Sequence, residues 1–141
     1  MLSNRSVPPC TVIPVLYYPD PGAAAEWLCA AFGFTVRLRI GNHRIQMKAG
    51  EGCFIVAERK ATADGSEPVD NTHLVMVRVP NAHSHCERAR QHGARILQPP
   101  VDQVYGERQY NAEDFAAHRW TFTQSIADVA PEDWGGTSVD L

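Results

Sequence analysis

Arginine, tyrosine and threonine side chains gather between Tyr105 and Ser125, and their chemistry suits an anionic or oxygen-rich ligand. A guanidinium can bind a carboxylate through two parallel hydrogen bonds, and hydroxyl groups can donate to or accept from ligand oxygens. The residues are Arg108, Tyr110, Arg119, Thr121 and Thr123. From this stretch alone the alternative, a solvated outer face of a sheet, is favoured.

The same stretch predicts two strands joined by a turn. Aromatic and polar residues alternate along 118–125, so Trp120 and Phe122 are expected to face an apolar core. Residues 114–117 are expected to form the turn. Arg108 and Tyr110 of the first strand are expected to share the opposite, polar face with the arginine and threonines of the second strand.

Two similar segments precede or include this hairpin. The first has a strand at 11–18 containing Pro14, a helix capped by Asp20 and ended by Gly33, and strands at 35–40, 43–49 and 53–57. The second has a strand at 73–79, a helix capped by Asn81 and ended by Gly93, and the hairpin. A strand begun at 94–97 is expected to be interrupted by residues 98–100.

The two segments predict an α+β fold made of two βαβββ repeats. Thirteen residues separate Asp20 from Gly33, and twelve separate Asn81 from Gly93. Each repeat is too small to bury a good core alone. We therefore expect one eight-stranded curved sheet around a concave cleft, with the helices on its convex face. The expected segments are a flexible N-terminus 1–10, repeats 11–59 and 73–126, a linker 60–72 and a tail 127–141.

This arrangement favours the functional interpretation of the polar residues, since both hairpins would turn their polar faces into one cleft. Aromatic side chains would add a flat apolar wall to such a cleft. The residues expected to bind a ligand there are Tyr17, Arg37, Arg39, Arg108, Tyr110, Arg119 and Thr121. The sequence shows no nucleophile–base pair, so no catalytic residue and no mechanism are assigned.

Composition excludes several classes of partner. The chain has 141 residues and a net charge of −3, without a basic stripe that would indicate nucleic-acid binding. No apolar run approaches the roughly 20 residues that cross a bilayer, and the N-terminus lacks the apolar core of a signal peptide. A cytoplasmic protein is expected. Its four cysteines, Cys10, Cys29, Cys53 and Cys86, form no CxxC pair and are expected to be free thiols.

The C-terminal segment predicts one short helical turn at Pro131–Trp134, because proline suits the first helical position. We expect Trp134 to be mostly buried, near the last strand or across a dimer contact, and the residues after Gly136 to be loosely held. The alternative is a frayed tail with an exposed ring.

Over residues of about 11 to 134 the chain resembles the vicinal oxygen chelate superfamily, which includes glyoxalase I, bleomycin-resistance proteins and extradiol dioxygenases. Asp114, His118 and Trp120 are similar to a glyoxalase-like subgroup, whose turn usually reads Asp-Pro-x-Gly followed by His-x-Trp. Phe115 and Ala117 replace the proline and the glycine, and residues 131–135 are also similar to that subgroup. The resemblance implies a small-molecule ligand and a homodimer.

The superfamily's enzymes chelate one divalent metal, and the resemblance places the ligand positions on Ile13, Leu74 and Thr121, with no donor in the fourth strand before Glu58. Isoleucine and leucine cannot bind a metal, so no metal cofactor is expected. Alternatively, a one-residue slip in register would offer His73 and Glu58, with Gln124 or His118, to Zn, Ni, Fe or Mn.

These expectations lead to two functional hypotheses. The first is a glyoxalase/bleomycin-resistance-like protein that binds a small oxygen-rich or anionic molecule without a metal, to sequester it or to transform it. The alternative is a metal-dependent lyase or dioxygenase of the glyoxalase type. Among the other histidines, His83, His85 and His92 are expected to be solvated, while His118 could cap the turn or orient a group in the cleft.

Overall fold

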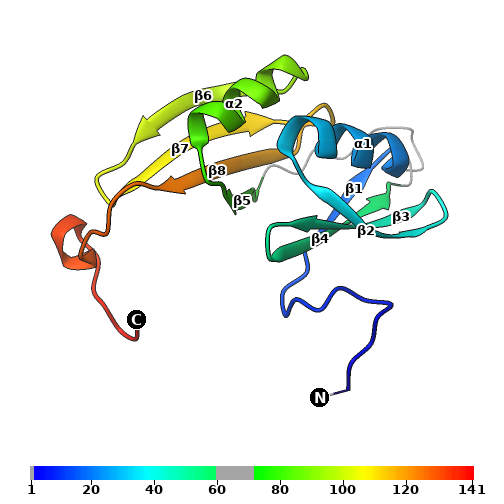
Figure 1. Ribbon diagram of the computed structural model, residues 1–141, viewed down its shortest axis with the longest axis horizontal. Coiled ribbons are helices and arrows are strands. Elements are labelled where there is room, and N and C mark those ends of the chain that lie inside the picture. Colours follow the sequence, from blue (N-terminus) through cyan, green and yellow to red (C-terminus); the bar gives the residue numbers. More distant parts are fainter. Residues whose placement is uncertain (1, 60–71) are drawn as a thin grey trace. The chain divides into compact units, whose positions relative to one another are not determined.

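The computed structural model describes residues 2–59 and 72–141. The chain divides into two compact units, Met1–Pro68 and Val69–Leu141, and each is a four-stranded sheet with one helix packed on one face (Figure 1). The predicted α+β fold of two βαβββ repeats is confirmed. The expected linker, apart from Thr72, lies outside the described residues.

In the first unit the sheet order is β1-β4-β3-β2, and β1 runs parallel to β4. The elements are β1 (Val15–Tyr18), α1 (Pro21–Phe32), β2 (Thr35–Ile40), β3 (Arg44–Ala49) and β4 (Gly52–Glu58). Pro14 lies just before the first strand rather than within it, and its carbonyl accepts a hydrogen bond from the Ile55 N–H at 2.9 Å.

In the second unit the sheet order is β5-β8-β7-β6, with β5 parallel to β8, so the topology of the first unit is repeated. The elements are β5 (Val75–Arg78), α2 (Ala82–Gln91), β6 (Arg95–Asp102), β7 (Glu107–Glu113), β8 (Arg119–Ser125) and the 3₁₀ helix η1 (Pro131–Trp134). In the described part of the chain, neither α-helix is long and apolar enough to cross a membrane.

Both α-helices begin at the predicted caps. The Asp20 side chain accepts a hydrogen bond from the Ala23 N–H at 3.2 Å, and Asn81 accepts one from the Ser84 N–H at 3.0 Å. Gly33 is the C-cap of α1 and has a φ of 78°. In α2 the C-cap is His92, and Gly93, which directly follows it, has a φ of 91°. These glycines adopt the left-handed conformation that residues with a Cβ rarely tolerate.

The helix-facing side of each sheet forms the core. In the first unit, Leu28 of α1 packs over a layer of fully buried side chains that includes Ile45, Met47 and Val56. In the second unit the layer is aromatic, with the Trp120 and Phe122 rings 6.1 Å apart and nearly parallel. The alternation of β8 therefore predicted its buried face correctly.

The hairpin register differs from the prediction by one residue. The Asp114 N–H donates to the His118 carbonyl at 2.9 Å, so these two residues pair and only 115–117 form the loop. Tyr110 consequently lies opposite Phe122 and Arg108 lies opposite Gln124. The expectation that Tyr110 and Arg108 share the polar face was wrong, because a one-residue change of register moves a whole strand's side chains to the other face.

Two further strands depart from regular alternation. The β2–β3 register shifts between Val36 and Leu38, so Arg39 lies opposite buried Ile45 on the α1 side while Arg37 points away from α1. The expectation that Arg37 and Arg39 share a face was wrong because of this bulge. Strand β6 continues through its predicted interruption at residues 98–100, with two register shifts.

The N-terminal strap, residues 2–14, is held against the first sheet. The Arg5 carbonyl accepts from Arg37 Nη2 at 3.0 Å, and the Ser6 carbonyl accepts from Gln46 Nε2 at 2.8 Å. Cys10 forms a disulfide with Cys53, whose Cα lies 6.4 Å away and 43 positions along the chain. Free thiols were therefore a wrong prediction for this pair, because the return of the strap to β4 has no local sequence signal.

At the C-terminus the predicted helical turn is confirmed as η1, but Trp134 is 46% exposed. The predicted burial was wrong for the single chain, in which the Tyr105 ring contacts the indole at a centroid distance of 5.0 Å. The tail after Gly136 was expected to be loosely held. It is tied down at Ser138, whose N–H and hydroxyl both donate to Glu132 Oε2 at 2.8 and 2.9 Å.

Candidate functional site

The second sheet presents a polar face on the side away from α2. The register assigns alternate residues of β5, β7 and β8 to this side, because Thr121 pairs with Met76 and Asn111, and Thr123 pairs with Arg78 and Gln109. We call this surface the open face. Its residues are Met76, Arg78, Glu107, Gln109, Asn111, Thr121, Thr123 and Ser125.

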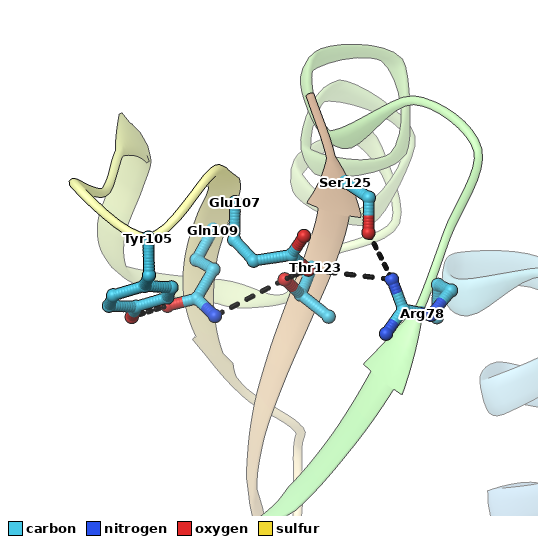
Figure 2. A network of polar contacts seen from close by, with 6 residues as sticks. All are labelled: Arg78, Tyr105, Glu107, Gln109, Thr123 and Ser125. Atoms are coloured by element: carbon cyan, nitrogen blue, oxygen red, sulfur yellow. Dashed lines mark hydrogen bonds and ion pairs between the residues drawn. The ribbon is translucent and has the colours of Figure 1, made fainter. Parts of the chain in front are cut away.

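A connected polar network runs across the open face (Figure 2). Tyr105 Oη donates to Gln109 Oε1 at 2.9 Å, and Gln109 Nε2 donates to Thr123 Oγ1 at 3.2 Å. The Thr123 hydroxyl in turn donates to Glu107 Oε1 at 2.7 Å. Each donor in this row is directed at an acceptor, so the side chains are held in fixed positions.

Arg78 closes the other end of the network. Its Nη1 lies 3.5 Å from Glu107 Oε1 and also donates to Ser125 Oγ. The Arg78 side chain is 69% exposed, whereas the Glu107 side chain is 17% exposed. The guanidinium therefore retains a wide surface for a further partner.

The carboxylate of Glu107 is stabilised in its ionised form. Burial by itself would raise the pKa of Glu107, but hydrogen bonds from Ser125 and Thr123 and the charge of Arg78 outweigh it, and the pKa is lowered. A carboxylate with a lowered pKa is a weak base at neutral pH. Glu107 is thus better suited to accepting hydrogen bonds than to abstracting protons.

Exposed apolar groups flank this polar row. Met76 of β5 is 57% exposed, and Leu74, which directly precedes β5, is 49% exposed. At the Tyr105 end, the indole of Trp134 is tilted by 47° against the tyrosine ring. A ligand on the open face would meet polar groups in the middle and apolar surface at each end.

Within each unit, the predicted ligand-binding residues are divided between the two faces of the sheet. In the second unit, Thr121 lies on the open face and its hydroxyl donates to Asn111 Oδ1 at 2.8 Å. Arg119 is on the same side and pairs with Glu113 at 3.7 Å. Arg108 lies on the α2 side, where two of its nitrogens bind the Asp102 carboxylate at 2.6 and 3.1 Å.

Tyr110 is part of the core rather than a ligand-binding group. Its hydroxyl forms a hydrogen bond with His85 Nδ1 of α2, and its ring stacks on Phe122 at 5.2 Å. Burial, with a smaller effect of Cys86, raises the pKa of Tyr110 well above its ordinary value, so the hydroxyl stays protonated. His85 was expected to be solvated; it is half-buried against this tyrosine.

The three remaining candidates belong to the first unit. Tyr17 is 52% exposed and points away from α1, since its neighbours Leu16 and Tyr18 are buried under the helix. Arg37 also points away from α1, but the strap and Gln46 engage its guanidinium. Arg39 lies on the α1 side, near Cys29. Burial raises the pKa of the Cys29 thiol, and the charge of Arg39 offsets part of this rise.

The positions that the resemblance assigns to metal ligands do not fit a metal. Ile13 and Leu74 have no donor atom, and the Thr121 hydroxyl is directed at Asn111. In residues 2–59 and 72–141, no three His, Cys, Asp or Glu side chains form a group that could hold an ion. Whether the protein is free of metal stays a prediction.

In the second unit, the alternative ligands Gln124 and His118 take part in local hydrogen bonds. Gln124 Oε1 accepts from the Ala82 N–H at 2.8 Å on the α2 side, and the His118 N–H donates to Asp114 Oδ1 at 3.0 Å in the hairpin turn. His73 is exposed. Glu58 lies at the end of β4, where it lines an open pocket of about 380 Å³ with Pro19, Asp20, Pro21, Asn42 and His43.

Sequence reasoning missed Arg78, Glu107, Gln109 and Asn111 as members of the open face, the candidate binding surface. A signal for three of them was present in the hairpin. Asp114 can accept hydrogen bonds from its own turn, which favours pairing of Asp114 with His118 and a three-residue loop. That register would have placed Glu107, Gln109 and Asn111 beside the threonines.

The sequence matches a known protein family over most of its length. Residues 11–122 match the model of the Glyoxalase/Bleomycin resistance protein/Dioxygenase superfamily. The chain belongs to this superfamily. No curated protein matches the sequence.

Solved structures of this superfamily share the fold. TioX from Micromonospora sp. ML1 is 30% identical, with a TM-score of 0.67, and the match covers 86% of this chain and 100% of that one. A glyoxalase/bleomycin resistance protein/dioxygenase family enzyme from Burkholderia phytofirmans PsJN is 17% identical, with a TM-score of 0.68, and the match covers 79% and 95%. The fosfomycin resistance protein FosX from Listeria monocytogenes is 14% identical, with a TM-score of 0.61. That match covers 89% of this chain and 95% of FosX.

Proposed function

We propose that this superfamily member binds a small oxygen-rich molecule carrying an anionic group, and that it does so on the open face without a metal ion. The observation that carries the proposal is the network of Figure 2, in which Arg78 retains an exposed guanidinium beside fixed amide and carboxylate groups. A carboxylate or phosphonate on the ligand would bind Arg78. Ligand hydroxyl or amide groups would pair with Glu107 and Gln109.

The aromatic end of the open face supports a ligand that also contains a flat ring. Trp134 is held by Tyr105 yet remains half exposed, which leaves one side of the indole available for stacking. Such a ring contact contributes about 0.5–1.5 kcal/mol beyond the burial of area, and a hydrogen bond to a charged group contributes about 1.5–3 kcal/mol. Several such contacts are needed together, because micromolar binding requires about −8.2 kcal/mol after the cost of association is subtracted.

The described residues favour binding over catalysis. Two hydroxyls on the open face bond to the Glu107 carboxylate: that of Thr123, which is 4% exposed, and that of Ser125, which is exposed and also accepts from Arg78. The pKa of Glu107 is lowered, so this carboxylate is a weak base for activating either hydroxyl. Sequestration of a toxic compound fits this chemistry. The superfamily includes bleomycin resistance proteins, and a fosfomycin resistance protein shares the fold, which is consistent with such a role.

Two further parts of the proposal rest on the superfamily and the sequence. We infer a homodimer, which the family resemblance implies, and we propose a cytoplasmic location. Sedimentation at micromolar concentration checks the first, and a monomeric mass contradicts it. Fractionation of cells that express the full chain checks the second.

The deciding experiment is a thermal-shift screen of carboxylate- and phosphonate-bearing aromatic compounds, because a specific ligand raises the Tm by mass action. Hits are repeated in EDTA and with the Arg78→Gln variant. The matched control is Arg90→Gln on α2, a comparably exposed arginine paired with Glu87. We expect the shift to survive EDTA, to disappear in Arg78→Gln and to persist in the control. Shifts that vanish in EDTA contradict metal-free binding.

A further inference from the structure

The N-terminal strap covers part of the face of the first sheet that points away from α1. Gln46 and Ile55 are paired on that face, and they are only 2% and 6% exposed in a position where sheet side chains ordinarily meet solvent. The strap binds this face directly through the hydrogen bond from Gln46 to the Ser6 carbonyl, and Pro8 is buried. The strap thus occupies the first unit's counterpart of the open face.

Hydrogen bonds to three backbone carbonyls hold the strap against the sheet. Arg37 donates to the Arg5 carbonyl and Gln46 to the Ser6 carbonyl, while the Ile55 N–H donates to the Pro14 carbonyl where the strap enters β1. The disulfide adds a covalent cross-link between the strap and the sheet, from Cys10 to β4 across 43 positions. A cross-link of this length strongly restricts an otherwise flexible terminus.

We propose that the Cys10–Cys53 disulfide is a thiol-exchange site that latches the strap, and that a dithiol reductant releases it. A thiolate of the dithiol attacks one sulfur of the disulfide and forms a mixed disulfide, while the other cysteine leaves as a thiolate and takes up a proton. The second thiol of the reductant, deprotonated, then displaces the remaining cysteine. The dithiol is oxidised to a disulfide, and Cys10 and Cys53 become thiols.

The surroundings of the cysteines make this pair the reactive one. Cys10 and Cys53 are both partly exposed, so a thiolate can approach them. Burial raises the pKa of the Cys29 thiol and of the Cys86 thiol, and Cys86 is 2% exposed. Little thiolate forms at these two positions at neutral pH, which keeps them from competing in the exchange.

Release of the strap would change the chemistry of the first sheet. Arg37 Nη2 and Gln46 Nε2 would lose their carbonyl acceptors, and a guanidinium and an amide would become available to a ligand. The reduced protein therefore gains donors on a face that the oxidised protein covers. This inference does not depend on the ligand proposed for the open face of the second unit.

The test compares the full-length protein in its oxidised and dithiothreitol-reduced states. Tryptic mapping under non-reducing conditions, with fragmentation of the linked peptides, must first assign the cross-link to Cys10 and Cys53 in oxidised protein, because tryptic peptide 6–37 also contains Cys29. Hydrogen exchange and the rate of tryptic cleavage after Arg5 are then measured. We expect the reduced strap to lose protection and to be cleaved at least about tenfold faster, since cleavage follows the population of the open form.

Two variants separate latching from general loosening. Cys53→Ser should behave in both redox states like reduced wild type, whereas Cys29→Ala should retain the redox response. Exchange in residues 107–125 should be the same in all samples. Absence of the cross-linked peptide overturns the proposal, and so do equal cleavage rates after Arg5 in the oxidised and reduced protein.

Discussion

Trp120 donates its indole N–H to Asp114 Oδ2 at 3.1 Å, and this bond joins the hairpin turn to the aromatic core of the second unit. The other carboxylate oxygen of Asp114 accepts from the backbone N–H groups of Ala116 and His118, both at 3.0 Å. One buried side chain thus fixes the loop, the register of β7 against β8 and the orientation of the largest core ring.

We expect Asp114→Ala to lower the free energy of unfolding by about 3 kcal/mol, because three donors lose their partner and the Trp120 N–H stays buried. Urea denaturation followed by tryptophan fluorescence measures this. Asp128→Ala is the matched control, since Asp128 is exposed, and it should change stability by less than about 0.5 kcal/mol. Equal effects of the two substitutions would show that the carboxylate is dispensable.

Ala117 has a φ of 70°, a conformation that is unfavourable for any residue with a Cβ. Ala117→Gly should therefore stabilise the protein by about 0.5–1 kcal/mol, after the greater flexibility of glycine in the unfolded chain is subtracted. Ala116→Gly, one position earlier with an ordinary φ, should be neutral or destabilising. Thermal unfolding of both variants decides the matter, and a lower Tm for Ala117→Gly contradicts the strain argument.

The lowered pKa of Glu107 predicts an acid-sensitive contribution to stability. Since the folded-state pKa lies below the unfolded value of about 4.3, the contribution is present above the unfolded pKa and is lost as the pH falls through the folded pKa. Glu107→Gln should reduce the difference in urea midpoint between pH 6 and pH 3. The comparison variant is Glu132→Gln, because the pKa of Glu132 is lowered as well. This substitution should remove only the contribution of Glu132 to the difference in urea midpoint, and the contribution of Glu107 should remain.

Trp134→Ala should lower the free energy of unfolding by no more than about 1 kcal/mol, because the indole is already half exposed and contacts the Tyr105 ring. The same substitution should weaken ligand binding on the open face by at least about threefold if the ring stacks on a ligand. Isothermal titration with a compound from the screen measures the second effect. Trp27→Phe in α1 is the control that should leave binding unchanged.

Purified protein should contain less than about 0.1 equivalent of Zn, Ni, Fe or Mn, since the positions assigned to ligands carry Ile13, Leu74 and an engaged Thr121. Elemental analysis by plasma mass spectrometry, before and after dialysis against EDTA, measures this. The lyase or dioxygenase alternative would be supported by a different result. In that case the protein contains one equivalent of metal, and EDTA removes both this metal and the lyase or dioxygenase activity.

Local chemistry made much of the fold predictable. Asp20 and Asn81 are short polar residues that cap helices through their own side chains, and the alternation of Trp120 and Phe122 indicates a buried face without reference to other segments. These features require only neighbouring residues. The elements and their repetition could therefore be predicted, whereas the superfamily was identified by the resemblance of residues such as Asp114, His118 and Trp120.

The site was harder to predict because it depends on pairing between strands. The face that Tyr110 occupies depends on whether residue 113 or 114 closes the turn, and the face of Arg39 depends on a bulge two residues earlier. The approach of Cys10 to Cys53 depends on the path of the whole strap. The arginines and hydroxyl-bearing residues of the hairpin indicate that one face of the sheet is polar. The strand register decides which of these residues lie on that face.

Strand β6 is one of the two edge strands of the second sheet, and it carries two consecutive prolines, Pro99 and Pro100. Neither can donate a backbone hydrogen bond, and the register shifts beside them disturb the regular spacing that another strand would need. Fibril growth and strand exchange through this edge are therefore obstructed. A protein that must stay dispersed at high concentration, as a stoichiometric binder does, gains protection against aggregation from this edge.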